Sequence, residues 1–337
     1  MPCYHPLIRI ETWDGKVTIE SKQNFDTDIT DHQNFKSKNK LGRNSKNWKR
    51  ADTIPCGKCT GCRLDYSRNW ANRIVLESKE YNKDSNWFLT LTYNDENLPI
   101  KEVVNTETGE AIKGFSLWKK DLQDFIKRLR YYYPGIRYYA AGEYGEIGER
   151  PHYHACIFNL NISKDKLKKY KNNNSGDAIY QCAEIEKIWD KGFITIAPLS
   201  WETAAYTARY IMKKQFGSEA ENYYLSKAKN PEFTVMSRKP GIGLNYYNEH
   251  KEEIYKNDEI AIPRRSGAIM ITPPKIFDKK FELEEKEKMR LIKARRKINL
   301  NRNEISKYEQ NHRTPQEQRE IEERSKIEKA KTLIRNI

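Results

Sequence analysis

The sequence lacks several features that would define other classes of protein. No apolar run approaches the ~20 residues that a helix needs to cross a bilayer. The N-terminus, Met1-Pro-Cys-Tyr-His5, does not have the form of a signal peptide. The chain has no Gly-x-x-x-x-Gly-Lys-Ser/Thr phosphate loop, and its glycine-rich stretch at 142–148 lacks the spacing of a dinucleotide fingerprint. We therefore expect a cytoplasmic protein with no membrane partner and no nucleotide-driven motor.

Charge is strongly unbalanced. The 62 Lys and Arg residues outnumber the 47 Asp and Glu residues, which gives a formal net charge of +15. A positive field of this size favours a polyanionic partner such as nucleic acid, the alternative being a soluble protein whose surface is merely basic. Hydrophobic residues make up only 37% of the chain, so an extended or disordered charged segment is expected.

Hydrophobic periodicity predicts an α+β fold with a central antiparallel sheet of about five strands and flanking helices. Residues 1–55 look polar and irregular, and the chain beyond Pro274 looks like a charged helical or partly disordered tail. The predicted domains are 1–65, with a cysteine knuckle, 66–272 and 273–337. Strands are predicted at 87–93, 136–141, 150–160 and 193–197, and helices at 64–81, 117–133, 182–189 and from Ser200 onward.

Two histidines alternate in the segment Arg150-Pro-His-Tyr-His-Ala-Cys-Ile-Phe158. In a strand, His152 and His154 point to the same side, where paired imidazoles suit a metal ion. Glu143 is the predicted third ligand, because a tight glycine-containing connection brings it back beside His152. This set leaves coordination positions for water and a phosphate oxygen. The alternative is a pair of ordinary strand histidines bonded to their neighbours.

Helical spacing places Tyr206, Tyr210 and Lys213 on one face of the predicted helix. A phenol with a pKa of about 10 is a poor nucleophile at neutral pH, but a nearby metal or ammonium group favours the phenolate. Two phenols one turn apart suit a covalent relay in which they act in alternation. The alternative is an aromatic stripe that packs on the sheet.

The cysteines are expected to be thiols or metal ligands rather than disulfides. Cys56, Cys59 and Cys62 form two overlapping Cys-x-x-Cys units, whose spacing suits a structural zinc ion with Cys3, or else His5, as the fourth ligand. An iron–sulfur cluster and a reduced loop are the alternatives. Basic residues that could contact DNA, where they would meet phosphates beside stacking tyrosines, are Lys119, Lys120, Lys127, Arg128, Arg130, Arg238 and Lys239.

Together these segments resemble the HUH endonucleases, the rolling-circle replication initiators, and above all those of microviruses of the gokushovirus type. The resemblance covers roughly residues 56–250. Phe88-Leu-Thr-Leu-Thr-Tyr93 resembles the first motif, and Arg150-Pro-His-Tyr-His154 resembles the metal-binding second. Tyr206-x-x-x-Tyr210-x-x-Lys213 resembles the third in its two-tyrosine form, and Gly142-Glu143 matches the usual position of the third ligand.

The resemblance implies metal-dependent, site-specific nicking of origin DNA. His152, His154 and Glu143 would hold one Mg²⁺ or Mn²⁺ ion, and a tyrosine would attack to leave a 5′-phosphotyrosine link and a free 3′-hydroxyl. The second tyrosine would then cut the regenerated origin so that the displaced circle is closed. The Tyr-x-x-Lys spacing favours Tyr210 as the first nucleophile, and Lys213 would hold the phosphate or favour the phenolate.

The implied partners are single-stranded origin DNA and the double-stranded replicative form, in the cytoplasm of a bacterial host. Because the chain has no Gly-x-x-x-x-Gly-Lys-Ser/Thr phosphate loop to drive a helicase, the host would supply the helicase, and also the single-strand-binding protein and the polymerase. Two other interpretations stay open. The same core could serve a plasmid initiator, relaxase or transposase, or the chain could be a zinc-stapled DNA-binding regulator that never cuts.

Overall fold

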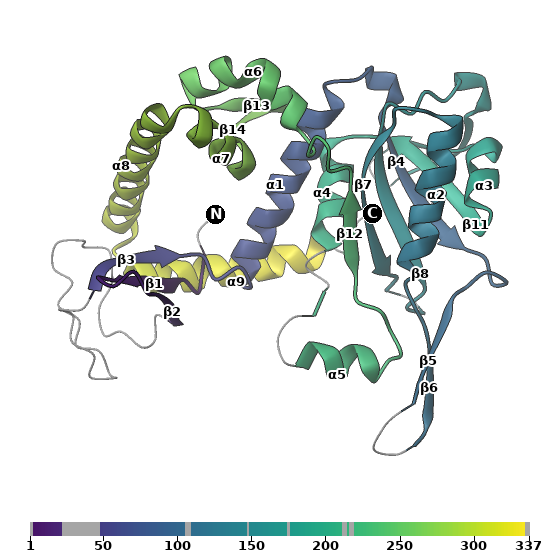
Figure 1. Ribbon diagram of the computed structural model, residues 1–337, viewed down its shortest axis with the longest axis horizontal. Helices are drawn as coiled ribbons and strands as arrows, with labels where there is room; N and C mark the ends of the chain where they lie inside the picture. Colours follow the sequence, from purple (N-terminus) through teal and green to yellow (C-terminus); the bar gives the residue numbers. More distant parts are fainter. Residues whose placement is uncertain are drawn as a thin grey trace. The chain divides into compact units, whose positions relative to one another are not determined.

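The computed structural model describes residues 3–21, 48–104, 109–146, 148–173, 176–210, 214–215 and 219–333 (Figure 1). The chain divides into two compact units. The first comprises Met1–Asp65 with Glu304–Arg335, and the second comprises Tyr66–Asn303 with Asn336–Ile337. The division into three domains that the sequence suggests stays a prediction.

The first unit contains a small antiparallel sheet in the order β2-β1-β3. Its elements are β1 (Leu7–Thr12), β2 (Val17–Ser21), β3 (Trp48–Ile54) and α9 (Pro315–Leu333). Ile8 and Ile10 on β1 are fully buried. The prediction of an irregular N-terminal loop is therefore wrong for the described part, because the alternation of these two isoleucines is a strand signal among many polar residues.

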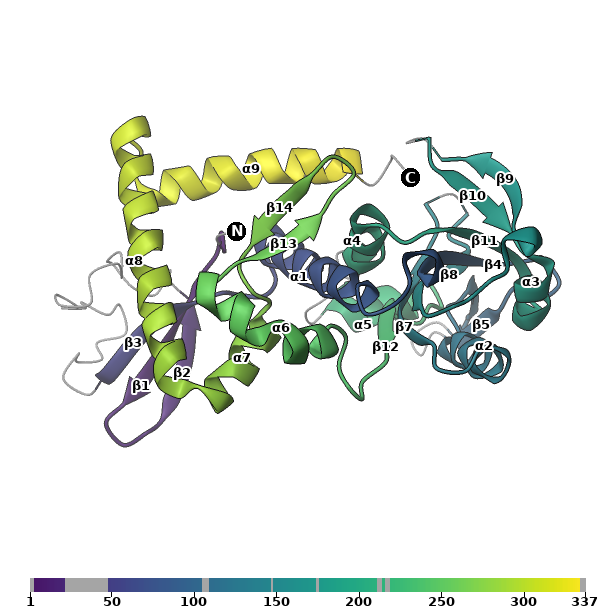
Figure 2. The same ribbon diagram turned by 90° about the horizontal axis from the view of Figure 1, so that it is seen from above.

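The second unit is built on a seven-stranded antiparallel sheet rather than the expected sheet of about five strands. The strands, in spatial order, are β12 (Phe233–Met236), β7 (Arg137–Tyr144), β8 (Pro151–Phe158), β4 (Trp87–Tyr93), β11 (Gly192–Pro198), β10 (Ala178–Gln181) and β9 (Lys168–Asn172) (Figure 2). The additional strands at the edges have only four or five residues, which is too short for a clear alternation of apolar and polar residues.

Helices cover both faces of this sheet (Figure 1). α2 (Lys119–Tyr132) and α3 (Ala183–Trp189) pack on the face to which Leu91 and Tyr153 contribute. α1 (Thr60–Ser78) and α4 (Trp201–Arg209) pack on the face of Phe88 and Cys156. The core on the face of Phe88 and Cys156 continues into α6 (Leu244–Asn257) and α7 (Lys275–Glu284). Phe277 and Phe281 of α7 are buried in it.

Smaller elements complete the second unit. β5 (Ile100–Val104) and β6 (Ala111–Phe115) form a hairpin arm, and β13 (Ile260–Pro263) pairs with β14 (Ala268–Ile271). α5 (Glu219–Leu225) and the short 3₁₀ turns Lys83–Ser85 and Lys164–Lys166 also belong to the second unit, whereas α8 (Lys286–Asn311) begins in the second unit and ends in the first. Among the described residues, no helix is both long and apolar enough to span a membrane.

Gly192 allows strand β11 to approach β4 closely. Its φ is +150°, and a Cβ atom there would lie 2.3 Å from the carbonyl oxygen of Thr92 and 2.5 Å from the amide nitrogen of Asn94. We expect Gly192→Ala to lower the free energy of unfolding by about 2–4 kcal/mol, because backbone atoms cannot yield as a flexible side chain can.

Urea unfolding of the full chain measures this effect. Gly267→Ala is the matched control, because Gly267 also has a positive φ (+78°) but no atom within 4 Å of the added methyl group. It should cost only about 1–2 kcal/mol. Equal losses in the two variants would contradict the argument from close approach.

Candidate active site

Backbone register places Glu143 and the two histidines side by side. β7 pairs with β8 so that Glu143 lies opposite His152, and β4 pairs with β8 so that Thr90 lies opposite His154. His152 and His154 are two residues apart on one strand, so these side chains leave the same face of the sheet. A backbone hydrogen bond from Gly145 closes the turn that sets the register.

One carboxylate oxygen of Glu143 faces both imidazoles. Glu143 Oε1 lies 2.7 Å from His152 Nε2 and 3.1 Å from His154 Nε2. Glu143 is only 2% exposed. Burial raises the pKa of this carboxyl group, but the hydrogen bonds and charges of the two imidazoles outweigh it and hold the pKa well below its usual range. The site therefore presents a carboxylate anion to two ring nitrogens.

The arrangement of donors fits a divalent ion. The carbonyl oxygen of Arg150 lies 3.2 Å from His152 Nδ1, and since a carbonyl only accepts, Nδ1 carries the proton. The Nε2 lone pair of a neutral His152 then faces a carboxylate oxygen, which requires a cation or an added proton between them. Ligands at about 2.1 Å from an octahedral ion are about 3.0 Å apart, close to the two observed distances. The cluster of Glu143, His152 and His154 could thus hold a metal ion.

Two residues of β4 orient His154. Thr90 Oγ1 lies 3.1 Å from His154 Nδ1, which leaves Nε2 directed toward Glu143. The ring of Phe88 stacks on the His154 ring with centroids 5.5 Å apart and planes 4° apart. Both belong to the segment that resembles the first family motif, but sequence reasoning did not assign them a partner. The alternation of Phe88, Thr90 and Thr92 along one strand could have indicated that these residues share a face with the histidines.

The tyrosine helix begins at a well-formed cap. The Ser200 side chain accepts a hydrogen bond from the amide of Thr203, and the Thr203 hydroxyl accepts one from the amide of Ser200. Ala204, Ala205 and Ala208 are buried against the sheet. Their small side chains let α4 approach closely, which brings the tyrosines of this helix onto the histidine face.

Both tyrosine rings contact His154. The Tyr206 and Tyr210 rings lie 5.0 Å and 4.9 Å from it between centroids, and 4.8 Å from each other. Burial and the Glu143 charge raise the pKa of Tyr206 to about 12, and burial raises that of Tyr210 further. At a pKa of about 12, only about one phenol in 10⁵ is ionised at pH 7. Lys213, predicted to assist, lies outside the described residues.

The predicted DNA-contacting residues of α2 lie elsewhere. α2 packs on the face opposite the histidines, with its buried Phe125 in the same core as Tyr153. Arg128 is tied to the carbonyls of Ile188 and Trp189 and to a neighbouring carboxylate. Lys120 and Lys127 pair with Asp124, Lys119 lies over the Phe233 ring, and Arg130 lies over the Tyr138 ring.

Arg238 and Lys239 are exposed in the turn after β12. The preceding residue, Ser237, is hydrogen-bonded to Tyr138, five residues from Glu143 along β7. At 3.3 Å per residue, this turn is roughly 17 Å from the histidine cluster. The structure therefore groups none of the seven predicted basic residues with Glu143.

An exposed aromatic side chain shares the histidine face. Phe193 on β11 pairs with Thr92, which in turn pairs with His152. Directly paired residues lie on the same face, so the Phe193 side chain, 60% exposed, extends this face beyond the histidines. Sequence reasoning predicted this strand but did not single out Phe193, since one aromatic residue in a short strand carries no signal of its own.

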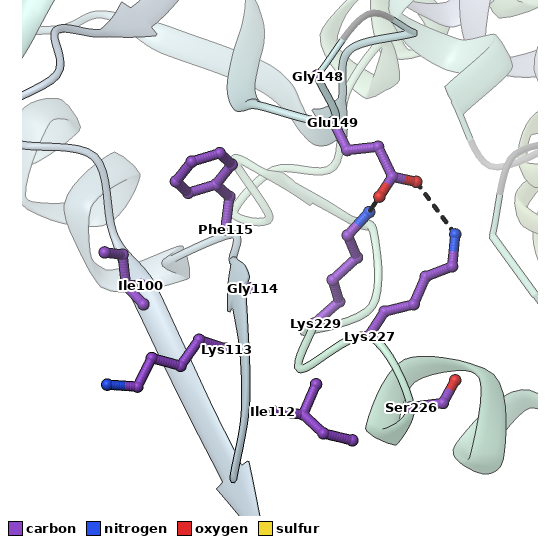
Figure 3. Close-up of a pocket in the computed structure, with 10 residues that line it drawn as sticks. All are labelled: Ile100, Ile112, Lys113, Gly114, Phe115, Gly148, Glu149, Ser226, Lys227 and Lys229. Atoms are coloured by element: carbon purple, nitrogen blue, oxygen red, sulfur yellow. Dashed lines mark hydrogen bonds and ion pairs between the residues drawn. The ribbon is translucent and has the colours of Figure 1, made fainter.

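A pocket of about 410 Å³ borders the turn between β7 and β8, but it does not contain the Glu143 cluster (Figure 3). The β5–β6 arm forms one wall, with Phe115, and the segment after α5 forms another. Glu149 lies between Lys227 and Lys229, 3.1 Å and 2.7 Å from their Nζ atoms. Glu149 thus neutralises the charge of two of the pocket's lysines. The candidate active site is therefore the cluster of Glu143, His152 and His154 rather than this pocket.

The second cluster of possible metal ligands consists of Cys3, Cys56, Cys59 and Cys62 in the first unit. Burial raises the pKa of Cys59, but hydrogen bonds led by the Cys62 amide outweigh it and lower the pKa to about 7. Burial raises the pKa values of Cys3 and Cys62. Cys156 and Cys182 are buried in the second unit and are not members of this cluster.

Comparison with known proteins gives the family. Residues 86–215, which contain the histidine pair and both tyrosines, match the model of the replication-associated protein ORF2/G2P family. The chain is 40% identical over 259 residues to the replication-associated protein ORF2 of Spiroplasma virus 4, which is 75% of each chain. This protein therefore belongs to the replication-associated protein family of small phages, of the microvirus type.

More distant relatives carry similar names. The replication-associated protein VP4 of Bdellovibrio phage phiMH2K is 30% identical over 63% of each chain. The replication-associated protein ORF4 of Chlamydia phage 1 is 24% identical over 62% of this chain and 49% of its own. No solved structure matches the chain.

The role of Thr90 can be tested through metal affinity. Thr90→Val removes the hydroxyl that orients His154 and should weaken Mn²⁺ binding by about 10-fold, as loss of a second-sphere partner commonly does. Isothermal titration with Mn²⁺ measures this affinity. Thr92→Val is the control, because the Thr92 hydroxyl donates to the carbonyl of Phe193 rather than to a histidine. Equal affinities for the two variants would refute the assigned role.

Proposed function

We propose that this protein initiates rolling-circle DNA replication by nicking one strand of the origin through a tyrosine. One observation carries the proposal: the rings of Tyr206 and Tyr210 both pack against His154, whose Nε2 shares Glu143 with His152. Two nucleophiles and a metal-ligand cluster thus meet on one sheet face. In this proposal the sheet and α4 form an HUH-type nuclease palm.

The proposed metal is one Mg²⁺ or Mn²⁺ ion. A carboxylate and two imidazoles suit either ion, and three protein ligands leave positions for phosphate and water. When bound, the ion would act as a Lewis acid on the scissile phosphate and offset charge in the transition state. Thr90 and the Arg150 carbonyl contact the Nδ1 atoms of His154 and His152, which leaves both Nε2 atoms directed at the proposed metal position.

The protein supplies the nucleophile. A tyrosine Oη would form a bond to phosphorus while the bond from phosphorus to the 3′-oxygen breaks. The products are a 5′-phosphotyrosine and a 3′-hydroxyl, which a host polymerase could extend. The link retains the energy of the phosphodiester, so the reverse attack by a 3′-hydroxyl closes a circle without ATP. The two rings lie 4.8 Å apart, so both hydroxyls could act at one phosphate position in turn.

Burial and spacing favour different first nucleophiles. Tyr210 is only 4% exposed and has the more strongly raised pKa, which favours Tyr206 as the first to meet DNA. The Tyr-x-x-Lys spacing to Lys213 favours Tyr210. A cation at Glu143 would lower both pKa values, because the Glu143 charge is the second contribution after burial that raises them.

Alternative functions differ in what happens after binding. A relaxase, plasmid initiator or transposase would use the same core, and the fate of the 3′-hydroxyl separates them: primer extension supports an initiator, whereas strand transfer supports a transposase. A non-catalytic regulator would bind origin DNA without cutting it. The arrangement of two phenols beside the metal-ligand cluster favours a nuclease, since a regulator needs neither.

The nicking proposal is tested on supercoiled origin DNA with Mg²⁺ or Mn²⁺. The His152→Ala/His154→Ala variant should not nick, because only Glu143 remains to hold the ion. Tyr206→Phe and Tyr210→Phe should each retain some covalent capture of DNA, seen as a shifted band in a denaturing gel. The double tyrosine variant should retain none.

Circular dichroism of each variant controls for folding. Cys182→Ser is a matched substitution in the opposite core and should nick as the wild type does. Unimpaired cleavage by the histidine variant, or covalent capture by the double tyrosine variant, would rule out the proposed mechanism.

The face that binds DNA is tested with two exposed aromatic residues. Phe193→Ala should weaken binding of a single-stranded origin oligonucleotide about 5- to 150-fold, as expected for the loss of about 1–3 kcal/mol of base stacking. Tyr131→Ala, an 82% exposed residue on α2 and the opposite face, should leave the affinity unchanged. Fluorescence anisotropy measures both affinities. A larger loss of affinity in Tyr131→Ala than in Phe193→Ala would indicate that DNA binds the α2 face instead.

A further inference from the structure

Four cysteine thiols converge in the first unit, where the nicking chemistry has no use for them. Cys3 precedes β1, Cys56 and Cys59 follow β3, and Cys62 lies in the first turn of α1. Their sulfur atoms all lie within 4.8 Å of one another. We propose that these four residues bind one zinc ion in a closed site, and that this ion holds the first unit in its folded form.

The spacing of the sulfur atoms fits a single ion. Tetrahedral zinc with Zn–S bonds of about 2.3 Å places its sulfur ligands about 3.8 Å apart. The Cys3 and Cys59 Sγ atoms are 3.8 Å apart, far beyond the length of about 2.05 Å of a disulfide bond. An iron–sulfur cluster would insert a cage of several atoms between the thiolates, which these short separations do not accommodate.

Backbone amides already point at the sulfur atoms. The amide of Cys56 donates to Cys3 Sγ over 3.2 Å. The amides of Lys58 and Cys59 donate to Cys56 Sγ over 3.4 Å and 3.3 Å. Four thiolates around a dication carry two net negative charges, and N–H groups directed at sulfur offset them. Neutral thiols, as weak acceptors, would gain little from these donors.

Cys3, rather than the neighbouring His5, completes the set. The His5 imidazole points elsewhere: its Nε2 lies 2.9 Å from a carboxylate oxygen of Glu323, and the side chain is 68% exposed. The Cys3 sulfur instead contacts both Cys56 and Cys59. The four ligands thus come from two stretches of the first unit that are far apart in the sequence, Cys3 before β1 and residues 56–62 between β3 and the first turn of α1.

Within the part that the structure describes, the apolar core of the first unit is very small. Among its residues whose side chains the structure describes, the buried apolar ones are Tyr4, Ile8 and Ile10. Three buried side chains offset little of the conformational entropy lost on folding. An ion that joins the segment before β1, the end of β3 and the start of α1 would supply the missing cohesion, because the free energy of metal binding then becomes free energy of folding.

Metal analysis of the full-length protein tests the occupant. Plasma mass spectrometry should find about one zinc and no iron per chain. The same zinc content is expected in the His152→Ala/His154→Ala variant, which excludes zinc bound at the nuclease cluster. Iron in place of zinc, or zinc that disappears in the histidine variant, would overturn the assignment.

Single substitutions test the ligands. Cys3→Ser and Cys59→Ser should lose the zinc, whereas His5→Ala and Cys182→Ser should keep it. Limited trypsin digestion should cut the two ligand variants, and the chelated wild type, within residues 3–21 and 48–65 at least 10-fold faster than the untreated wild type, while the second unit resists as before. Unchanged zinc content in Cys3→Ser, or unchanged digestion after chelation, would refute the proposal. Neither result bears on nicking, which is assayed separately.

Discussion

The register of three neighbouring strands determines the geometry of the candidate site. β7, β8 and β4 pair so that Glu143 faces His152 and Thr90 faces His154. A slip of one residue would turn these side chains toward the opposite face and into the core that holds α2. The tight turn after Tyr144 and the apolar residues on both faces fix this register. The cluster of Glu143, His152 and His154 is therefore a consequence of ordinary sheet pairing.

The two faces of the sheet have different roles. One face is covered by α2 and α3 and consists mainly of core. The other carries the histidines, the tyrosines of α4 and the exposed Phe193, and the alanines of α4 let that helix lie close to the strands. The basic residues of α2 lie on the covered side and contact neighbouring groups, whereas β4 and β11 beside the cluster contain no charged residue. Among its described residues, the first unit has few buried apolar side chains, and in our proposal a zinc ion held by four thiolates supplies the missing stability.

Several features could be predicted from the sequence, and others could not. The alternation around His152 and the glycines of the turn between Glu143 and His152 were sufficient to group Glu143 with both histidines. The periodicity of residues 117–133 gave the apolar side of α2, but it could not show which face of the sheet that side covers, because both faces are apolar. The strands β9, β10 and β12 were too short for their pattern to be seen, and β1 was hidden among polar residues. The roles of Thr90 and Phe88 depend on pairing across strands, which a single sequence does not display.

The central claim is that Tyr206 or Tyr210 becomes covalently joined to DNA. Mass spectrometry of tryptic peptides from the protein, after reaction with a single-stranded origin oligonucleotide and nuclease trimming, tests it most directly. We predict that the peptide containing Tyr206 or Tyr210 carries a nucleotide 5′-phosphate, and only when Mg²⁺ or Mn²⁺ was present. Cleaved DNA with no modified tyrosine, or a nucleotide attached to a residue other than Tyr206 and Tyr210, would contradict the account.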